Sequence, residues 1–425
     1  MTDAATPTGP VTRSSVARVG VATALTAACG YAVLYLAARV LEPAGFSVFA
    51  VFWGAFGLVT GASFGLLQQS TREIRIAAHV APDRRPVTHP LRVAAAVGVV
   101  TAAALAGSAA LWAPHVFAQE RTLSVTLLSV GLAGFCLHGT LLGMLAGANR
   151  WTQYGALMVT DAGLRVVVAV VTVLAGWGLV GFLWATVAGA ASWLMLLLAS
   201  PTSRAVAQLV AYESAGSFLR GAGHAVAAAG ASAILVMGFP VLLKATAGDL
   251  GATGGVVILA VTLTRAPLLV PLTAMQGNLI AHFVDQRRHR LRALAGPAGL
   301  VAAVGAVGVL AAGTAGPWLL RVGFGPDYDA DGSLLAWLTA GAVAIALLTV
   351  TGAATVAAAL HRAYSLGWVS ATLASALLLT LPLPLETRTV VALLCGPLVG
   401  IAVHVAVLAR QPHTLPRTTD AKETT

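Results

Sequence analysis

Residues 19–69 have the sequence VGVATALTAACGYAVLYLAARVLEPAGFSVFAVFWGAFGLVTGASFGLLQQ, and this segment decides the fold class. It contains two apolar stretches, at about 19–40 and 46–69, separated by the short polar segment LEPAG. An α-helix of about 20 apolar residues spans the ~30 Å hydrocarbon core of a bilayer. We therefore expect two membrane-spanning helices joined by a very short connection.

The rest of the chain repeats this pattern. Of its 425 residues, 58% are apolar and only 9% are charged, whereas an average soluble domain has about 25% charged residues. This composition excludes a soluble enzyme, a disordered protein and a disulfide-stabilised secreted module. Further apolar stretches lie at about 92–113, 122–147, 155–175, 179–199, 223–243, 253–281, 297–320, 333–360, 364–381 and 389–409. The sequence thus predicts an all-α, polytopic membrane bundle of about twelve transmembrane helices.

The basic residues indicate the orientation of this bundle. Of the 25 Lys and Arg residues, 18 fall on the side that holds both termini and 5 on the opposite side, while Arg165 and Arg265 lie within spans. Cytoplasmic connections carry the excess of Lys and Arg. We therefore expect a multi-pass plasma-membrane protein with both termini in the cytoplasm. Most of the net charge of +10 then reports topology, and we expect no nucleic-acid partner.

Short motifs recur half a chain length apart. Leu41–Phe46, between the first two spans, is followed 209 positions later by Leu250–Gly255. Phe117–Glu120 is followed 207 positions later by Phe324–Asp327. Motifs that recur in the same order at nearly constant spacing predict two six-helix lobes. Such lobes commonly enclose a substrate path between them.

A third match joins Asn149-Arg150 to His361-Arg362, 212 positions later. Because six spans are an even number, both lobes enter the membrane from the same side and form a parallel repeat. The expected division is a cytoplasmic N-terminal tail at 1–18, a first lobe at 19–205, a cytoplasmic linker at 206–221, a second lobe at 222–410 and a disordered cytoplasmic tail at 411–425.

Three charged residues inside the spans are the main functional candidates. A charge at the bilayer centre costs at least about 2.5–3.5 kcal/mol. Asp161 and Arg165 are four positions apart, so they can pair on one helix face. The pair either locks its helix to a neighbour, or lines a cavity with Arg165 facing an anionic group. Arg265 has no acidic residue within four positions, so it must face water, an anion or carbonyl oxygens.

Polar residues near the ends of spans complete the candidate set. Arg39 lies near the outer end of the first span, where it either snorkels to the interface or faces the cavity. Gln68 and Gln276 lie near the inner ends of two corresponding spans, as helix caps or as substrate contacts. The candidate substrate-binding residues are Arg39, Arg165, Arg265, Gln68 and Gln276, with Asp161 as the counter-charge or ion-coupling group.

Catalytic and cofactor motifs are absent from the sequence. There is no Walker A loop, no His-Glu-x-x-His motif and no Cys/His cluster, so we expect no nucleotide, metal or other cofactor and no enzyme. Asp327-Tyr328-Asp329-Ala330-Asp331 contains two overlapping Asp-x-Asp patterns. Asp329 and Asp331 could serve a metal-dependent membrane glycosyltransferase or polymerase. The alternative is a solvated loop whose last aspartate caps the next helix.

Several of these motifs resemble a known family. Arg39–Ala50, RVLEPAGFSVFA, is similar to the R-x-L-G-P-x-x-F-G-x-F/Y junction of Wzx-type polysaccharide-biosynthesis proteins. These are lipid-linked oligosaccharide flippases of the multidrug/oligosaccharidyl-lipid/polysaccharide (MOP) exporter superfamily. Phe324–Tyr328 resembles that family's F-G-x-x-Y/F motif, and Asp161 with Arg165 resembles its intramembrane pair. The chain departs from the family at Glu42, where Gly is frequent, and at Asp161, where Glu is frequent.

The resemblance implies a MATE/MOP-like transporter with a central cationic cavity that works by alternating access between its lobes. Its substrate would be a glycan on an undecaprenyl-pyrophosphate carrier, whose phosphates arginine recognises well. Its partners would be membrane lipids and the polymerase and glycosyltransferases of the same pathway. Two alternatives stay open. One is a cation-coupled multidrug exporter that relies on Asp161 as the only intramembrane acid, and the other is the glycosyltransferase or polymerase.

Overall fold

The computed structural model describes residues 13–77, 87–286 and 290–410, and these residues are nearly all helical. Its elements are α1 (Arg13–Ala77), α2 (Pro90–Gly107), α3 (Ala109–Val116), α4 (Arg121–Gly147), α5 (Trp151–Ala175), α6 (Gly178–Ala188), the 3₁₀ turn η1 (Gly189–Ala191), α7 (Ser192–Ala199), α8 (Pro201–Ala207), α9 (Ala215–Val236), α10 (Phe239–Ala247), α11 (Gly251–Ala274), α12 (Gln276–Asp285), α13 (Arg290–Phe324), α14 (Gly332–Ala357), α15 (His361–Leu378) and α16 (Leu385–Arg410). The expected all-α bundle is confirmed.

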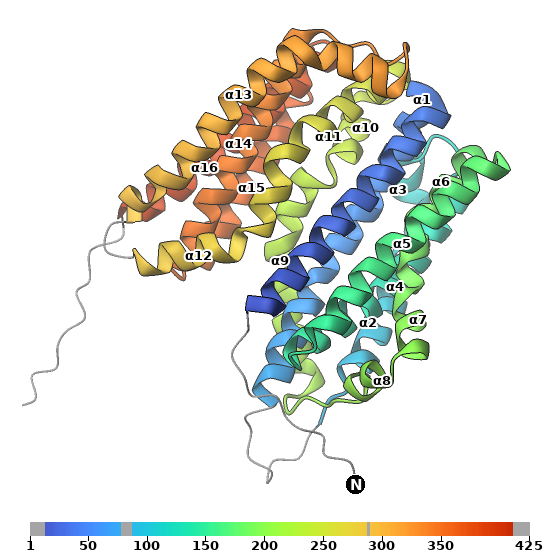
Figure 1. Ribbon diagram of the computed structural model, residues 1–425, viewed down its shortest axis with the longest axis vertical. Coiled ribbons are helices and arrows are strands. Elements are labelled where there is room, and N and C mark those ends of the chain that lie inside the picture. Colours follow the sequence, from blue (N-terminus) through green and yellow to red (C-terminus); the bar gives the residue numbers. More distant parts are fainter. Residues whose placement is uncertain (1–12, 78–86, 287–289, 411–425) are drawn as a thin grey trace, which may run out of the picture.

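The opening segment forms two helices that meet at Glu42. Glu42 has φ 56° and ψ 171°, which no helical residue adopts, and Pro43 follows it without an N–H to continue the ladder. The two arms of α1, 13–41 and 43–77, run back along each other (Figure 1). The helix begins at Arg13, inside the segment expected to be a tail, while 1–12 and 411–425 lie outside the described residues.

Nine helical segments within the described ranges are long and apolar enough to cross a membrane. This number is lower than twelve partly because α1 is counted once despite its kink, and neither α9 nor α10 is among the nine. The expected span at 364–381 falls mainly on α15, which does not meet this standard. The chain is a multi-pass membrane protein.

The helices contact one another mainly within each half of the chain. α4 packs on α1, α2 and α5, whereas α14 packs on α11, α13 and α16. In Figure 1, α13 to α16 lie together on one side and α2 to α8 on the other. The long helix α1 contacts α9, α10 and α11 and so joins the two groups. The exact domain boundaries stay a prediction.

Backbone geometry reveals the internal repeat directly. Glu42 and Gly251, which are 209 positions apart, both have left-handed backbone angles, with φ 56° and 50°. Each residue stands where one span ends and the next begins. Positive φ is uncommon for a non-glycine residue such as Glu42, so finding it at the position that corresponds to Gly251 supports a common origin of the two turns.

One expected correspondence shifts by two residues. Asn149 and Ala359 both have φ 58°, and the next residues, Arg150 and Leu360, donate equivalent hydrogen bonds of 2.8 and 2.9 Å to Leu145 and Thr355. Asn149-Arg150 therefore corresponds to Ala359-Leu360 and not to His361-Arg362. The basic side chains suggested the wrong register, because the repeat conserves the turn and not the charge.

Close packing in the first half depends on glycine in α4. A Cβ atom on Gly143 would overlap the backbone of Leu67 in the second arm of α1. The Thr71 hydroxyl donates a 3.1 Å hydrogen bond to the Gly143 carbonyl at the same crossing. Small residues let transmembrane helices approach in this way, and their packing supplies much of the stability.

We predict that Gly143→Ala lowers the thermal midpoint of the purified protein in detergent, because the helices must separate at a cost of about 1–3 kcal/mol. Gly299→Ala is the matched control, since no atom lies within 4 Å of the added Cβ. Equal midpoints for the two variants would contradict this account of the α1–α4 crossing.

Candidate functional site

Arg265 lies against a break in the helical ladder of the second half. α9 ends at Val236 and α10 begins at Phe239, with Pro240 in its first turn. Because Pro240 has no N–H, the Val236 carbonyl lacks its usual helical donor. Arg265 Nη1 donates to the Val236 and Leu235 carbonyls at 3.3 and 3.4 Å. A cation therefore meets the negative end of the α9 dipole.

The guanidinium of Arg265 is only partly satisfied. Its Cζ lies 5.1 Å from the ring centroid of Phe239, and Tyr31 of α1 is close enough to interact with it electrostatically. The residue is 7% exposed, and Nη2 has no hydrogen-bond partner among the described residues. An unpaired buried donor costs about 1–3 kcal/mol, more when charged. Of the three surroundings expected for Arg265, which were water, an anion or carbonyl oxygens, the structure shows carbonyl oxygens, and one guanidinium nitrogen has no partner among the described residues.

Arg165, by contrast, is fully engaged. Nε and Nη2 donate to Asp161 Oδ1 at 3.2 and 2.9 Å, and Nη1 donates to the Thr186 carbonyl at 2.7 Å. Its Cζ lies 5.2 Å from the ring centroid of Phe56. A Cβ on Gly189 would collide with this ion pair. The pair fastens α5 to the α6–η1 segment with every guanidinium nitrogen used.

The second half makes the same crossing without charges. Ser375 of α15 donates a 2.9 Å hydrogen bond to the Ala392 carbonyl of α16, as Arg165 does to Thr186. A Cβ on Gly396 would collide with Ser375, as one on Gly189 would with Arg165. The fold thus tolerates a serine at this crossing, so the Asp161–Arg165 pair is an additional feature of the first half.

A buried histidine lies beside this pair, and a second one occupies the other half. His138 Nδ1 lies 2.9 Å from Ser192 Oγ, between α4 and α7. His404 Nδ1 lies 3.0 Å from Thr351 Oγ1, between α16 and α14. Both rings are almost fully buried. Each histidine therefore makes a polar contact between helices.

Arg39 lies at one end of the bundle, away from Arg165 and Arg265. It is exposed, and its Nη1 approaches Gly325, between α13 and α14. Nearby, the buried Tyr328 hydroxyl donates a 2.9 Å hydrogen bond to the Ala38 carbonyl, and its ring packs on Phe46. Burial, aided by neighbouring carboxylates, raises the pKa of Tyr328, so the hydroxyl stays a donor. This contact joins the first two spans to the second half.

The two candidate glutamines, Gln68 and Gln276, are less buried than Gln69, which was not among the predicted site residues. Gln68 is exposed and Gln276 is half-buried. The adjacent Gln69 is buried and donates a 3.0 Å hydrogen bond to Glu73, whose side chain is 2% exposed. Glu73, which lies outside the expected span at 46–69, is therefore a second acid that is buried on the apolar helices, besides Asp161. Glu73 lies within the charged segment 72–75, and for this reason it was not among the predicted site residues.

The expected Asp-x-Asp pair occupies a solvent-facing loop. Asp329 is exposed and lies 3.7 Å from Arg321, and Asp331 stands at the N-cap position of α14 without a side-chain capping bond. No group of three or more possible metal ligands occurs among the described residues.

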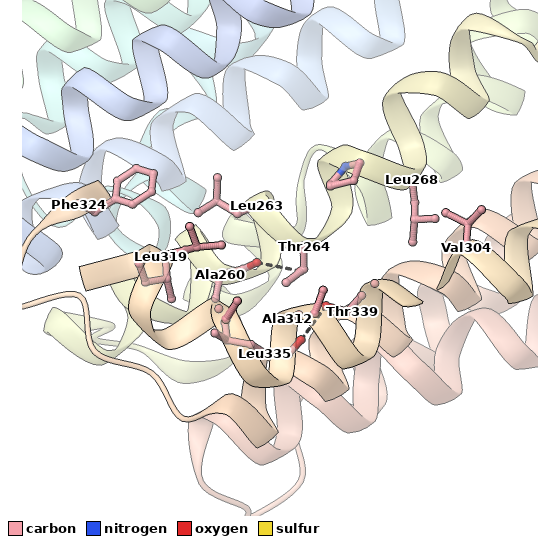
Figure 2. Close-up of a pocket in the computed structure, with 16 residues that line it drawn as sticks. Ala260, Leu263, Thr264, Leu268, Val304, Ala312, Leu319, Phe324, Leu335 and Thr339 are labelled. Carbon is pink, nitrogen blue, oxygen red and sulfur yellow. Dashed lines mark hydrogen bonds between the residues drawn. The ribbon is translucent and has the colours of Figure 1, made fainter. Parts of the chain in front are cut away.

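A groove that sequence reasoning missed lies between α11 and α13, with α14 as its floor (Figure 2). Its volume is about 600 Å³, and its lining is almost entirely apolar. Leu263 and Leu268 of α11 face Val304 and Leu319 of α13 across it. The sequence contained one indication of this groove, because α13 has smaller residues near Ala312 than the first half has at the corresponding positions.

The structure thus distributes the six candidate residues over several places. Arg165 and Asp161 bind each other in the first half, whereas Arg265 binds the α9–α10 break in the second. Arg39 lies at one end of the bundle, and the two glutamines lie on helices near the other. Among the residues expected to line a central cationic cavity, Arg265 is the arginine with a buried guanidinium nitrogen that has no hydrogen-bond partner in the described chain.

The two halves provide a direct test of the ion pair. We predict that Arg165→Ser alone destabilises the protein by about 3–5 kcal/mol, because Asp161 becomes an unpaired buried charge. Adding Asp161→Ala reproduces the Ala371 and Ser375 arrangement of the second half and should restore most of the thermal midpoint. A double variant as unstable as the single one would contradict the correspondence.

Comparison with known proteins identifies close relatives. No protein-family model matches the chain. It is 69% identical over 404 residues to Uncharacterized protein Mb3654 of Mycobacterium bovis, covering 95% of this chain and 94% of that protein. It is 67% identical over 408 residues to Uncharacterized protein Rv1510 of Mycobacterium tuberculosis, covering 96% and 94%.

Solved structures share the fold at low identity. An inward-facing multidrug resistance MATE family transporter of the MOP superfamily matches with a TM-score of 0.69 and 16% identity, over 93% of this chain and 98% of that one. An outward-facing MATE structure gives 0.59 and 16%, over 94% and 96%. A Pyrococcus furiosus MOP transporter described as having a binding pocket of reverse polarity gives 0.61 and 15%, over 93% and 95%. The chain therefore belongs to the family of the mycobacterial proteins Mb3654 and Rv1510, and it has the fold of MATE transporters of the MOP superfamily.

Proposed function

We propose that this protein is a transporter that moves a lipid-linked oligosaccharide across the plasma membrane by alternating access between its two halves. Both termini would lie in the cytoplasm, where the basic residues concentrate. The substrate would be an undecaprenyl-pyrophosphate-type glycan. The polymerase and glycosyltransferases of the same pathway would be its partners.

The observation that carries the proposal is the incomplete bonding of Arg265. Its Nη1 uses the carbonyls of the α9 end, whereas Nη2 is buried and has no partner in the part of the chain that the structure describes. A guanidinium with an unpaired N–H group suits a phosphate oxygen, because charge-assisted hydrogen bonds from arginine to phosphate are strong. The hydrogen bonds that Arg265 donates to the two carbonyls hold the cation in place before the substrate arrives.

The conformation supports alternating access. The chain matches the inward-facing MATE structure more closely than the outward-facing one. Its outer end is held by the contact of Tyr328 with Ala38 and Phe46, which joins the two halves. An arrangement closed at this end would admit the substrate from the cytoplasm.

We predict that Arg265→Ala reduces translocation of the lipid-linked glycan by about tenfold or more, because a charge-assisted hydrogen bond contributes about 1.5–3 kcal/mol. Arg265→Lys should retain part of the activity. The assay is transfer of a fluorescent lipid-linked glycan in proteoliposomes. Arg410→Ala, at the exposed end of α16, is the control. Full activity of inserted Arg265→Ala protein would overturn the assignment.

A cation-coupled multidrug exporter is the second candidate, because solved neighbours include proteins described as multidrug resistance transporters. Coupling would require protonation or ion binding at Asp161, whose carboxylate is already bonded to Arg165.

We predict that Asp161→Asn keeps the translocation of a lipid-linked glycan in proteoliposomes. Under the exporter alternative, the same variant loses pH-driven efflux of a cationic dye. Loss of dye efflux, together with wild-type insertion of the variant, would favour the exporter. The glycan assay on the same preparation serves as the internal control.

A further inference from the structure

The groove between α11 and α13 offers a ligand nothing but hydrocarbon contacts. Two threonines line it, but the Thr264 hydroxyl donates to the Ala260 carbonyl at 2.8 Å and the Thr339 hydroxyl to the Leu335 carbonyl at 2.7 Å. Figure 2 shows both hydroxyls turned to their own helices. An apolar pocket of this size, within the range of ligand sites, suits an apolar occupant.

The internal repeat shows that two positions lining this groove carry larger residues in the first half. With Phe117 aligned to Phe324, Leu105 and Trp112 of the first half correspond to Ala312 and Leu319. Trp112 is half-buried, packs on Phe117 at 5.7 Å between ring centroids and donates to Ser108 Oγ at 3.2 Å. The second half therefore has smaller side chains at both positions, and the space they leave contributes to the groove.

The groove opens beside the membrane-facing surface of α13. Val307 and Leu310, on the same helix, are 68% and 70% exposed. Apolar residues this exposed in a transmembrane helix face lipid chains. The available occupant of the groove is consequently a hydrocarbon chain from the bilayer.

α11 connects this groove to the cationic site. Thr264 lines the groove, whereas the next residue, Arg265, contacts the α9–α10 break on another side of the helix. One helix thus presents a partly bonded cation to the inside of the bundle and an apolar wall toward lipid. A lipid-linked substrate has the same two parts, an anionic head and a single long chain.

We propose that the groove between α11 and α13 binds the hydrocarbon chain of the transported lipid while Arg265 binds its phosphate. This inference rests on the proposed function, since the occupant is the substrate itself. A two-chain phospholipid is the competing occupant. A single chain fits one slot bounded by two helices, whereas a phospholipid must also place its second chain.

The test uses the full-length protein in nanodiscs and a diazirine-tagged polyprenyl phosphate as the probe. Ala312→Leu with Leu319→Trp gives the second half the residues that the first half already holds. We expect photolabelling of α11 and α13 in the wild type and a loss of about tenfold or more in the filled variant, because little apolar chain surface remains buried. Leu310→Trp, on exposed α13 surface, is the control and should label like the wild type.

A second filling variant guards against a folding defect. Gly308→Leu places a side chain toward Thr339 from a position where the added Cβ makes only an ordinary contact of 3.5 Å. It should also lose labelling. Wild-type labelling of either folded filled variant would overturn the proposal. So would equal competition by unlabelled phosphatidylglycerol and polyprenyl phosphate, which would make the groove a general lipid site.

The translocation assay separates this inference from the proposed function. If Arg265→Ala loses transport while the filled variants label normally, only the groove assignment is wrong. If Arg265→Ala transports normally while the filled variants lose labelling, the groove binds a chain but the proposed substrate path is wrong.

Discussion

The bonding of Arg265 to the end of α9 is the interaction on which the functional architecture depends. A membrane offers no water to satisfy a broken helix or a lone cation, so each must be satisfied by protein. Arg265 donates hydrogen bonds to the Leu235 and Val236 carbonyls, and these bonds partly satisfy both the broken helix and the cation. Their mutual satisfaction fixes a cation inside the bundle and still leaves Nη2 without a partner in the described chain.

Departures from the internal repeat mark the places where the two halves differ in chemistry. The first half has Asp161 and Arg165 where the second has Ala371 and Ser375, although both crossings place a glycine against them. The groove lining contains similar differences, since Ala312 and Leu319 stand where the first half has Leu105 and Trp112. A feature that only one half possesses is not required by a fold that both halves share.

The sequence pointed to the charged residues within the spans but not to the partners that each of them binds. The rarity of charges in lipid identified Asp161, Arg165 and Arg265 without a structure. Their roles diverged because Thr186 and Asp161 saturate Arg165, whereas the α9 end only partly engages Arg265. Glu73 was overlooked since it stands within a charged run, and the shifted match at Asn149 arose because charge does not define a turn.

The sequence alone determined that the chain is an all-α membrane bundle, that it is duplicated and that a few charges lie within its spans. These properties are local, because apolar length and residue type act wherever the chain folds. The tertiary structure decided which cation keeps a free donor, which apolar face becomes a groove and how the two halves are joined at the end of the bundle that holds Tyr328. Tyr328 and Ala38 lie 290 positions apart, and Arg265 and Leu235 lie 30 apart. Helical periodicity describes the surface of one helix, whereas such contacts depend on which neighbour faces it and where that neighbour breaks.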